Sequence, residues 1–213
     1  MRSSRRMEGA LSRTMDRGEF LKVGGGLAGG AALLGVAPVA YARVEVSSSV
    51  ENEFNRAAKR YRVPVELLLA MGYVNTHWEM PPASLCSYRR GDPERRGAFG
   101  IMALVQNPSA DTLGAASRLT GIPERRLKTD RFSNILGGAA LLASSQGSAR
   151  PATLAGWYGA VSGRGGHGPR YEAVSGVGGG DLYAAQVLQT LRKGASRRTS
   201  GGERIVLQAR EIS

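Results

Sequence analysis

The feature that most constrains the fold is an apolar stretch with helical spacing at residues 65–79. Large apolar side chains recur there as they do along one face of a helix: Leu67, Leu68, Met71, Val74 and Trp78. Pro64 suits the first position of a helix, and the pair Pro81-Pro82 cannot continue one. We therefore predict a buried helix over residues 65–79 at the centre of the fold.

Similar spacing predicts that most of the following chain is helical. The expected helices lie at residues 50–61, 113–119, 132–144, 151–161 and 181–191, with a short helical turn at 123–127. Residues 81–98 have no apolar period and contain four arginines, so we expect an exposed basic loop there. One alternating stretch, residues 204–208, predicts a strand. The expected fold class is all-α, with long loops: one helical domain over residues 43–193 and a basic linker or tail over residues 194–213.

Residues 1–42 have the pattern of an export signal peptide. Arginines precede a Gly-rich apolar stretch at residues 23–39, and Ala40-Tyr41-Ala42 matches a signal-peptidase site. We predict cleavage after Ala42 and an extracellular or wall-associated protein. Residues 17–22 resemble a twin-arginine signal, but Gly18 stands where the second arginine belongs, which leaves the route, Sec or Tat, open. The alternative is an uncleaved membrane anchor, because residues 23–42 have the length of about 20 residues that a membrane span needs.

The charge of the chain favours a polyanionic partner. After residue 42, Lys and Arg outnumber Asp and Glu by 23 to 14. The arginines are not interleaved with aromatic residues as in many nucleic-acid-binding proteins, and export argues against that class of partner. We therefore expect anionic cell-wall polymers as partners and no nucleic acid.

Cysteine and histidine are too scarce for a disulfide framework or for a zinc site built from them. The chain has one cysteine, Cys86, and two histidines, His77 and His167. We interpret Cys86 as a buried or half-buried apolar residue, with a reactive thiol as the alternative. We interpret His77 as a packed helix residue, with a site role as the alternative, and His167 as exposed. Residues 163–168 match G-x-G-x-x-G but follow a predicted helix rather than a strand. We expect no dinucleotide, no other cofactor and no metal.

Four segments together resemble the lysozyme-like lytic transglycosylase domain. They are residues 67–79 (LLLAMGYVNTHWE), 97–102 (GAFGIM), 134–139 (NILGGA) and 157–160 (WYGA). Their order and spacing agree with that family over residues 50–193, and the chain looks most like the version found in exported actinobacterial proteins in front of a peptidoglycan amidase domain.

The resemblance implies a lysozyme-like helical fold that acts on peptidoglycan. In the family, a helix ending in Glu-Ser carries the catalytic acid, a Gly-x-Met-Gln segment lines the glycan groove, and an Asn-x-x-x-Gly-Ala helix with an aromatic residue completes it. Carried over to this chain, the resemblance implies a set of glycan-binding residues: Tyr73, Asn75, Met102, Asn134, Trp157 and Tyr158.

The chain departs from the family at the catalytic position. Asn75 stands where the family has its glutamate, Thr76 where it has serine, and Ala103 where it has glutamine. Cleavage of a glycosidic bond needs a carboxylic acid that protonates the leaving oxygen, and an amide cannot do this. Glu79 lies four residues further on, which is one turn along the predicted helix and on the same face, so it is the weak candidate for a displaced acid.

Two hypotheses follow from this departure. In the first, the protein is an exported module that binds wall glycan, with muramidase chemistry lost or altered. In the second, it is an active lytic transglycosylase or muramidase that uses Glu79. A further alternative is that the chain is the N-terminal part of an N-acetylmuramoyl-L-alanine amidase, whose zinc domain would follow residue 213.

Overall fold

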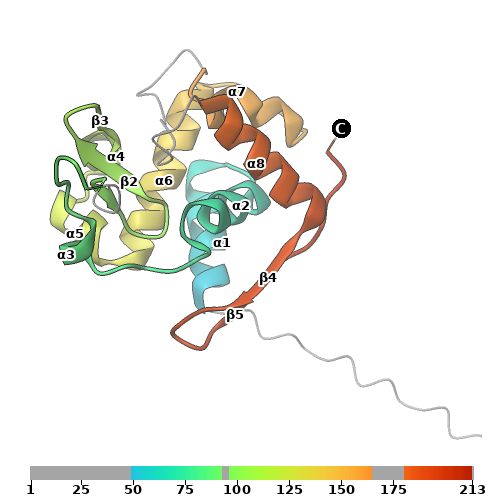
Figure 1. The fold of residues 1–213 in the computed structure, drawn as a ribbon. Helices are drawn as coiled ribbons and strands as arrows, with labels where there is room; N and C mark the ends of the chain where they lie inside the picture. The colour runs from blue at the N-terminus through green and yellow to red at the C-terminus, as the bar shows by residue number, and fades with distance from the viewer. Residues whose placement is uncertain (1–48, 93–95, 165–179, 213) are drawn as a thin grey trace, which may run out of the picture. The chain divides into compact units, whose positions relative to one another are not determined.

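Helices dominate the part of the chain that the structure, a computed structural model, describes: residues 49–92, 96–164 and 180–212 (Figure 1). The predicted signal peptide at residues 1–42 lies outside these ranges, and so do His167 and most of the glycine-rich motif at 163–168.

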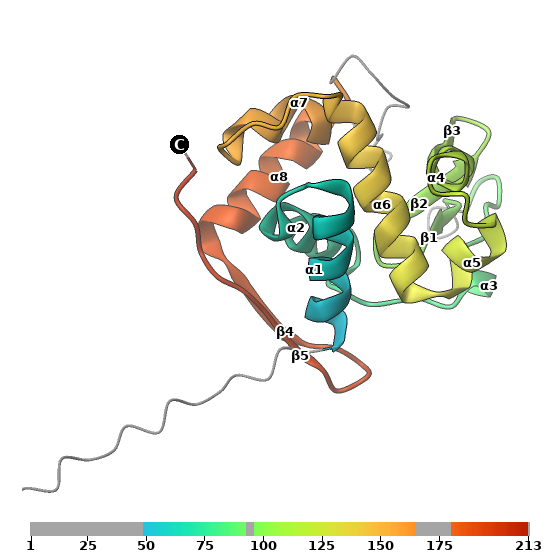
Figure 2. The same cartoon turned by 180° about the vertical axis from the view of Figure 1, so that it is seen from behind.

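Helix α2 (Val65–Thr76) lies at the centre of the described fold. It packs against α1 (Ser49–Tyr61), α8 (Gly180–Lys193) and strand β5 (Arg204–Leu207). Residues 67–72 of α2 are all buried, which confirms the prediction of a buried central helix. Figures 1 and 2 both show α1 and α2 between α8 on one side and the segments that carry α3 to α5 on the other.

The predicted end of this helix at residue 79 is wrong, because α2 ends at Thr76. His77 and Trp78 both adopt left-handed backbone conformations, with φ of 53° and 63°. Their N–H groups donate to the Tyr73 and Gly72 carbonyls, at 2.8 and 3.2 Å. The indole of Trp78 is buried and its Nε1 donates to the Leu69 carbonyl at 2.8 Å. Packing of the tryptophan therefore stabilises the left-handed turn.

Three short strands and three helices pack together beside α6 (Arg131–Gln146). Strands β1 (Ala98–Phe99), β2 (Leu104–Asn107) and β3 (Ala110–Asp111) form an antiparallel sheet in that order. The helices are α3 (Ala83–Cys86), α4 (Thr112–Thr120) and α5 (Glu124–Thr129), of which α4 and α5 contact α6. Helix α3 lies within residues 81–98, which were expected to form a loop.

The single cysteine belongs to this region. Cys86 is buried at the end of α3, as predicted, and burial raises the pKa of its thiol.

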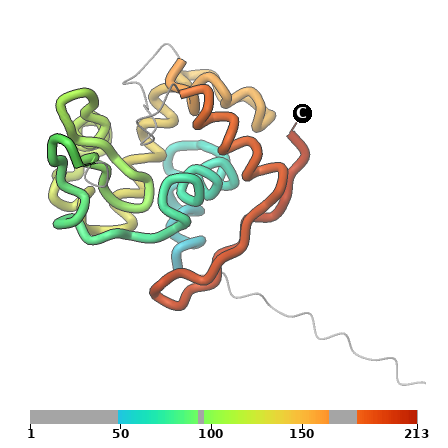
Figure 3. Tube along the Cα trace, in the orientation of Figure 1, coloured from blue at the N-terminus to red at the C-terminus, as the bar shows by residue number. Residues whose placement is uncertain are grey.

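The last part of the helical region leads into a β hairpin. A 3-10 turn (Ala155–Trp157) and α7 (Tyr158–Val161) precede α8, and β4 (Ala195–Arg198) then pairs antiparallel with β5. The strand predicted at 204–208 is therefore confirmed, and its partner lies within residues 194–213, the expected linker. Ile205 and Leu207 of β5 are buried in the same core as the helices. Figure 3 shows the chain trace continuing from α8 into this hairpin.

The described chain is thus mainly helical, with two small antiparallel sheets. Residues 44–213 group into one compact unit. In the described ranges, no helix has both the length and the hydropathy needed to cross a membrane.

Candidate functional site

A turn between β1 and β2 connects three of the segments that carry the family resemblance. It contains Gly100 and Ala103, whose φ values are +70° and +50°, and the Ala103 N–H donates to the Gly100 carbonyl at 2.9 Å. A side chain at position 100 would collide with Asn134, since a Cβ there would lie 2.3 Å from Asn134 Nδ2. We call residues 99–103 the turn segment.

Asn75 and Thr76 attach the end of α2 to this turn segment. Asn75 Nδ2 donates to the Met102 carbonyl at 3.1 Å, and Thr76 Oγ1 donates to the Ile101 carbonyl at 3.1 Å. Both side chains are half-buried. Within the described residues, no hydrogen bond reaches Asn75 Oδ1, so the amide has an acceptor oxygen and a second N–H that can serve a ligand.

Asn134 holds the turn segment from the opposite side. Its Oδ1 accepts from the Met102 N–H at 2.8 Å, and its Nδ2 donates to the carbonyls of Phe99 and Leu127 at 2.9 and 2.8 Å. Two asparagine amides therefore hydrogen-bond to the same residue, Met102, one through its carbonyl and the other through its N–H.

Three of the predicted glycan contacts need correction. Asn134 and Met102 are 0% exposed and Trp157 is 1% exposed, so none of these side chains meets a ligand at the surface. Asn134 uses its amide inside the protein, Met102 packs where α6 carries Gly138, and Trp157 Nε1 donates to the Pro151 carbonyl at 3.3 Å. These three side chains support the turn segment and the core, and they are not in contact with solvent.

The two predicted tyrosines are half-buried, and the contacts described for them are with residues other than Asn75. The Tyr73 ring packs against His77 and Trp78, with ring centroids 4.8 Å apart in both cases. Tyr73 and Asn75 project about 200° apart around α2, because successive helical residues turn by about 100°. The Tyr158 hydroxyl lies 3.3 Å from Asp181 Oδ1, and partial desolvation together with this carboxylate raises the pKa of the phenol.

Glu79 does not share a face with Asn75, because the helix ends before it. Its carboxylate accepts hydrogen bonds from Ser200 N at 3.0 Å and Ser200 Oγ at 2.7 Å, and lies 3.5 Å from the guanidinium of Arg197. Desolvation raises the pKa of Glu79, but the Ser200 hydrogen bonds and the Arg197 charge outweigh it and leave the pKa below its ordinary value. A general acid needs the opposite shift.

Sequence reasoning missed the partners of Glu79. Ser200 lies 121 residues further along the chain, in the turn of the hairpin, and nothing in its local pattern indicates this contact. Thr76, by contrast, could have been found from the sequence, since it directly follows Asn75 where the resemblance would place serine.

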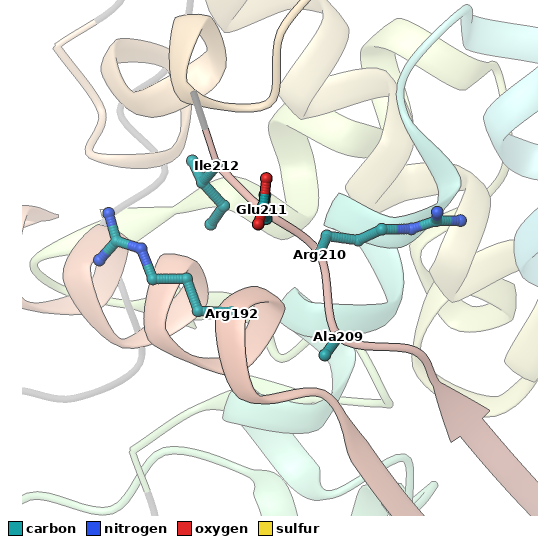
Figure 4. A pocket seen from close by; sticks show the side chains of 5 residues that line it. All are labelled: Arg192, Ala209, Arg210, Glu211 and Ile212. Atoms are coloured by element: carbon teal, nitrogen blue, oxygen red, sulfur yellow. The ribbon is translucent and has the colours of Figure 1, made fainter.

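A separate open cavity of about 530 Å³ lies at the end of α8, and none of the predicted site residues lines it. It is lined by Arg192 and by residues 209–212 after β5. Figure 4 shows the Arg192 and Arg210 side chains pointing away from one another, and Arg210 pairs with Glu66 at 3.2 Å. The two arginines at this cavity therefore do not converge on one ligand position.

Among the residues that the structure describes, no group of three or more His, Cys, Asp or Glu side chains is arranged to hold a metal ion. No protein-family model matches the chain, and no curated protein matches it.

Proposed function

We propose that the protein is an exported module with a lysozyme-like helical fold that binds peptidoglycan glycan strands without cleaving them. The observation that carries this proposal is Asn75, an amide in hydrogen-bond contact with the Met102 carbonyl at the position where the resembling family has its acid. Its free polar atoms can bind the acetamido and hydroxyl groups of a sugar, but they cannot protonate a leaving oxygen.

Two contacts support the lysozyme-like arrangement. The end of α2, the turn segment and Asn134 of α6 correspond to three segments of the resemblance, and hydrogen bonds join all three. In an arrangement of this kind, the turn segment forms one wall beside the catalytic position, and the buried Asn134 holds that wall in place.

The geometry of Glu79 disfavours the enzymatic alternative. Its carboxylate is occupied by Ser200 and Arg197, and its lowered pKa keeps it ionised at neutral pH. A carboxylate in this state is a poor proton donor, so retention of muramidase activity through Glu79 would require the hairpin contacts to break first.

Co-sedimentation with purified peptidoglycan tests the proposal. We expect the protein to sediment with the glycan and the Asn75→Ala variant to sediment about tenfold less, the loss typical of one or two ligand hydrogen bonds. Asn55→Ala is the matched control, because the Asn55 amide on α1 also makes one hydrogen bond to a backbone carbonyl, that of Glu51 at 3.0 Å. Equal sedimentation of both variants would remove Asn75 from the binding site.

A further inference from the structure

Among the residues that the structure describes, the arginines on the outer face of the β4–β5 hairpin have no acidic partner. Residues alternate between the two faces of a strand, and Ile205 and Leu207 point into the core. Arg204 and Val206 of β5 therefore lie on the outer face, together with their direct partners Arg198 and Ser196 of β4. Both arginines are exposed.

Arg198 and Arg204 stand directly opposite one another. Side chains in this position have Cβ atoms about 5 Å apart, and like charges there destabilise a hairpin. Arg198 donates to the Gly202 carbonyl at 2.8 Å, but in the described ranges neither arginine takes part in an ion pair. The hairpin thus contains a repulsive pair that an added anion would relieve.

Three carboxylates near the hairpin are engaged by other partners. Glu203 pairs with Arg131 at 2.9 Å, and Glu79 pairs with Arg197. The Glu51 carboxylate accepts from the Val206 N–H at 2.8 Å. These contacts tie the hairpin to α6, to the segment after α2 and to α1, and none neutralises Arg198 or Arg204.

The positive charge continues into the adjoining chain. Residues 192–210 contain six Lys and Arg against one acidic residue, and they contain no aromatic residue. Arg192 and Lys193 are exposed at the end of α8, which leads directly into β4 (Figure 1). The outer face formed by Ser196, Arg198, Arg204 and Val206 is called the basic hairpin face below.

We propose that the basic hairpin face binds a linear wall polymer whose backbone repeats phosphodiester groups. Paired guanidinium groups match phosphate oxygens bidentately, and closely spaced arginines favour a ligand in which anionic groups recur. Residues 192–210 contain none of the aromatic rings on which single-stranded nucleic-acid-binding proteins stack successive bases, which favours a polymer without bases over a single-stranded nucleic acid. The choice of a wall polymer rests on the proposed function.

Binding of fluorescently labelled poly(glycerol phosphate), followed by anisotropy, tests this site. We expect the double variant Arg198→Gln/Arg204→Gln to bind about tenfold more weakly than the unaltered protein, and the affinity of the unaltered protein to fall as salt rises. The matched control is Arg118→Gln/Arg125→Gln. It removes the same charge from exposed positions on α4 and α5, on the other side of α1 and α2 (Figure 2).

Three results would overturn the site. The first is no change in anisotropy when the unaltered protein is added to poly(glycerol phosphate), which would mean that the polymer does not bind. The second is equal weakening of binding in both double variants, which would reduce the effect to net charge. Tighter binding of a double-stranded oligonucleotide or of phosphatidylglycerol vesicles would assign the face to another partner. Thermal unfolding provides the folding check: removal of the repulsive pair should leave the unfolding temperature equal or higher.

Peptidoglycan stripped of phosphate polymers by hydrofluoric acid separates this proposal from the proposed function. The hairpin variant should bind stripped glycan as well as the unaltered protein does. If neither protein binds stripped glycan while poly(glycerol phosphate) is still bound, the glycan-binding function fails and the hairpin site stands.

Discussion

Asn75 occupies a position that would keep a carboxyl group protonated. Its Nδ2 donates to the Met102 carbonyl from a half-buried place at the end of α2. A carboxylate there would face a carbonyl oxygen, whereas a protonated carboxyl could donate to it, so the neutral form would be favoured. The position of Asn75 would therefore suit a protonated acid, although the residue there is not an acid.

We predict that the carboxyl introduced by Asn75→Glu has a pKa above the ordinary glutamate value of about 4.3. The physical causes are partial desolvation and the hydrogen bond to the Met102 carbonyl, which only the protonated form can make. Carbon-13 NMR titration of the labelled carboxyl measures the pKa. An ordinary or lowered value would mean that this position does not suit an acid.

Asn134 shows why residue roles are hard to read from sequence. The resemblance marks it as a glycan contact, but a surface amide that binds sugar and a buried amide that holds a turn look the same in the chain. Only tertiary packing distinguishes them, and here the amide makes three hydrogen bonds inside the protein.

Asn134→Ala should therefore lower the free energy of unfolding by about 3 kcal/mol, because the Met102 N–H and two carbonyls lose their buried partner. Urea denaturation measures the loss. Asn55→Ala, which removes one half-buried hydrogen bond on α1, should cost less than about 1 kcal/mol. Unchanged stability of Asn134→Ala, with weaker glycan binding, would restore the role of a ligand contact.

At the scale of elements, helical periodicity correctly predicted which residues are buried, but it predicted their backbone conformation less well. Trp78 is buried, as its place in the apolar pattern indicated, but the chain brings it there through two left-handed residues after α2. The strands of the β1–β2–β3 sheet have two to four residues, too few for an alternating pattern to appear. The pattern found β5, but β4 is rich in arginine and gave no such signal.

The contact between Glu79 and the hairpin makes stability depend on pH. The folded-state pKa of Glu79 is lowered, so its contribution is present above the unfolded-state pKa of about 4.3 and is lost as pH falls through the folded value. Glu79→Gln should lower the free energy of unfolding by about 1 kcal/mol at pH 7. Below pH 4 the difference between the two proteins should shrink, as urea denaturation at several pH values would reveal. A difference that grows with acidification would contradict this account.

At the scale of the whole described unit, the hairpin after α8 belongs to the helical core. Arg131 at the start of α6 pairs with Glu53 of α1 at 2.6 Å and with Glu203 beside β5 at 2.9 Å, and these carboxylates raise the pKa of its guanidinium. The hairpin's contacts reach across as many as 155 residues of sequence, from Val206 to Glu51. Local pattern cannot report partners at such separations, so residues 194–213 looked like a tail.

The central claim is that the protein binds wall glycan without cleaving it. Its most direct test is incubation of the protein with purified peptidoglycan, with soluble muropeptides and sedimented protein measured in the same sample. We predict sedimentation of the protein with no release of muropeptides above the protein-free control. Release that Glu79→Gln abolishes would contradict the claim and establish the protein as a glycan-cleaving enzyme.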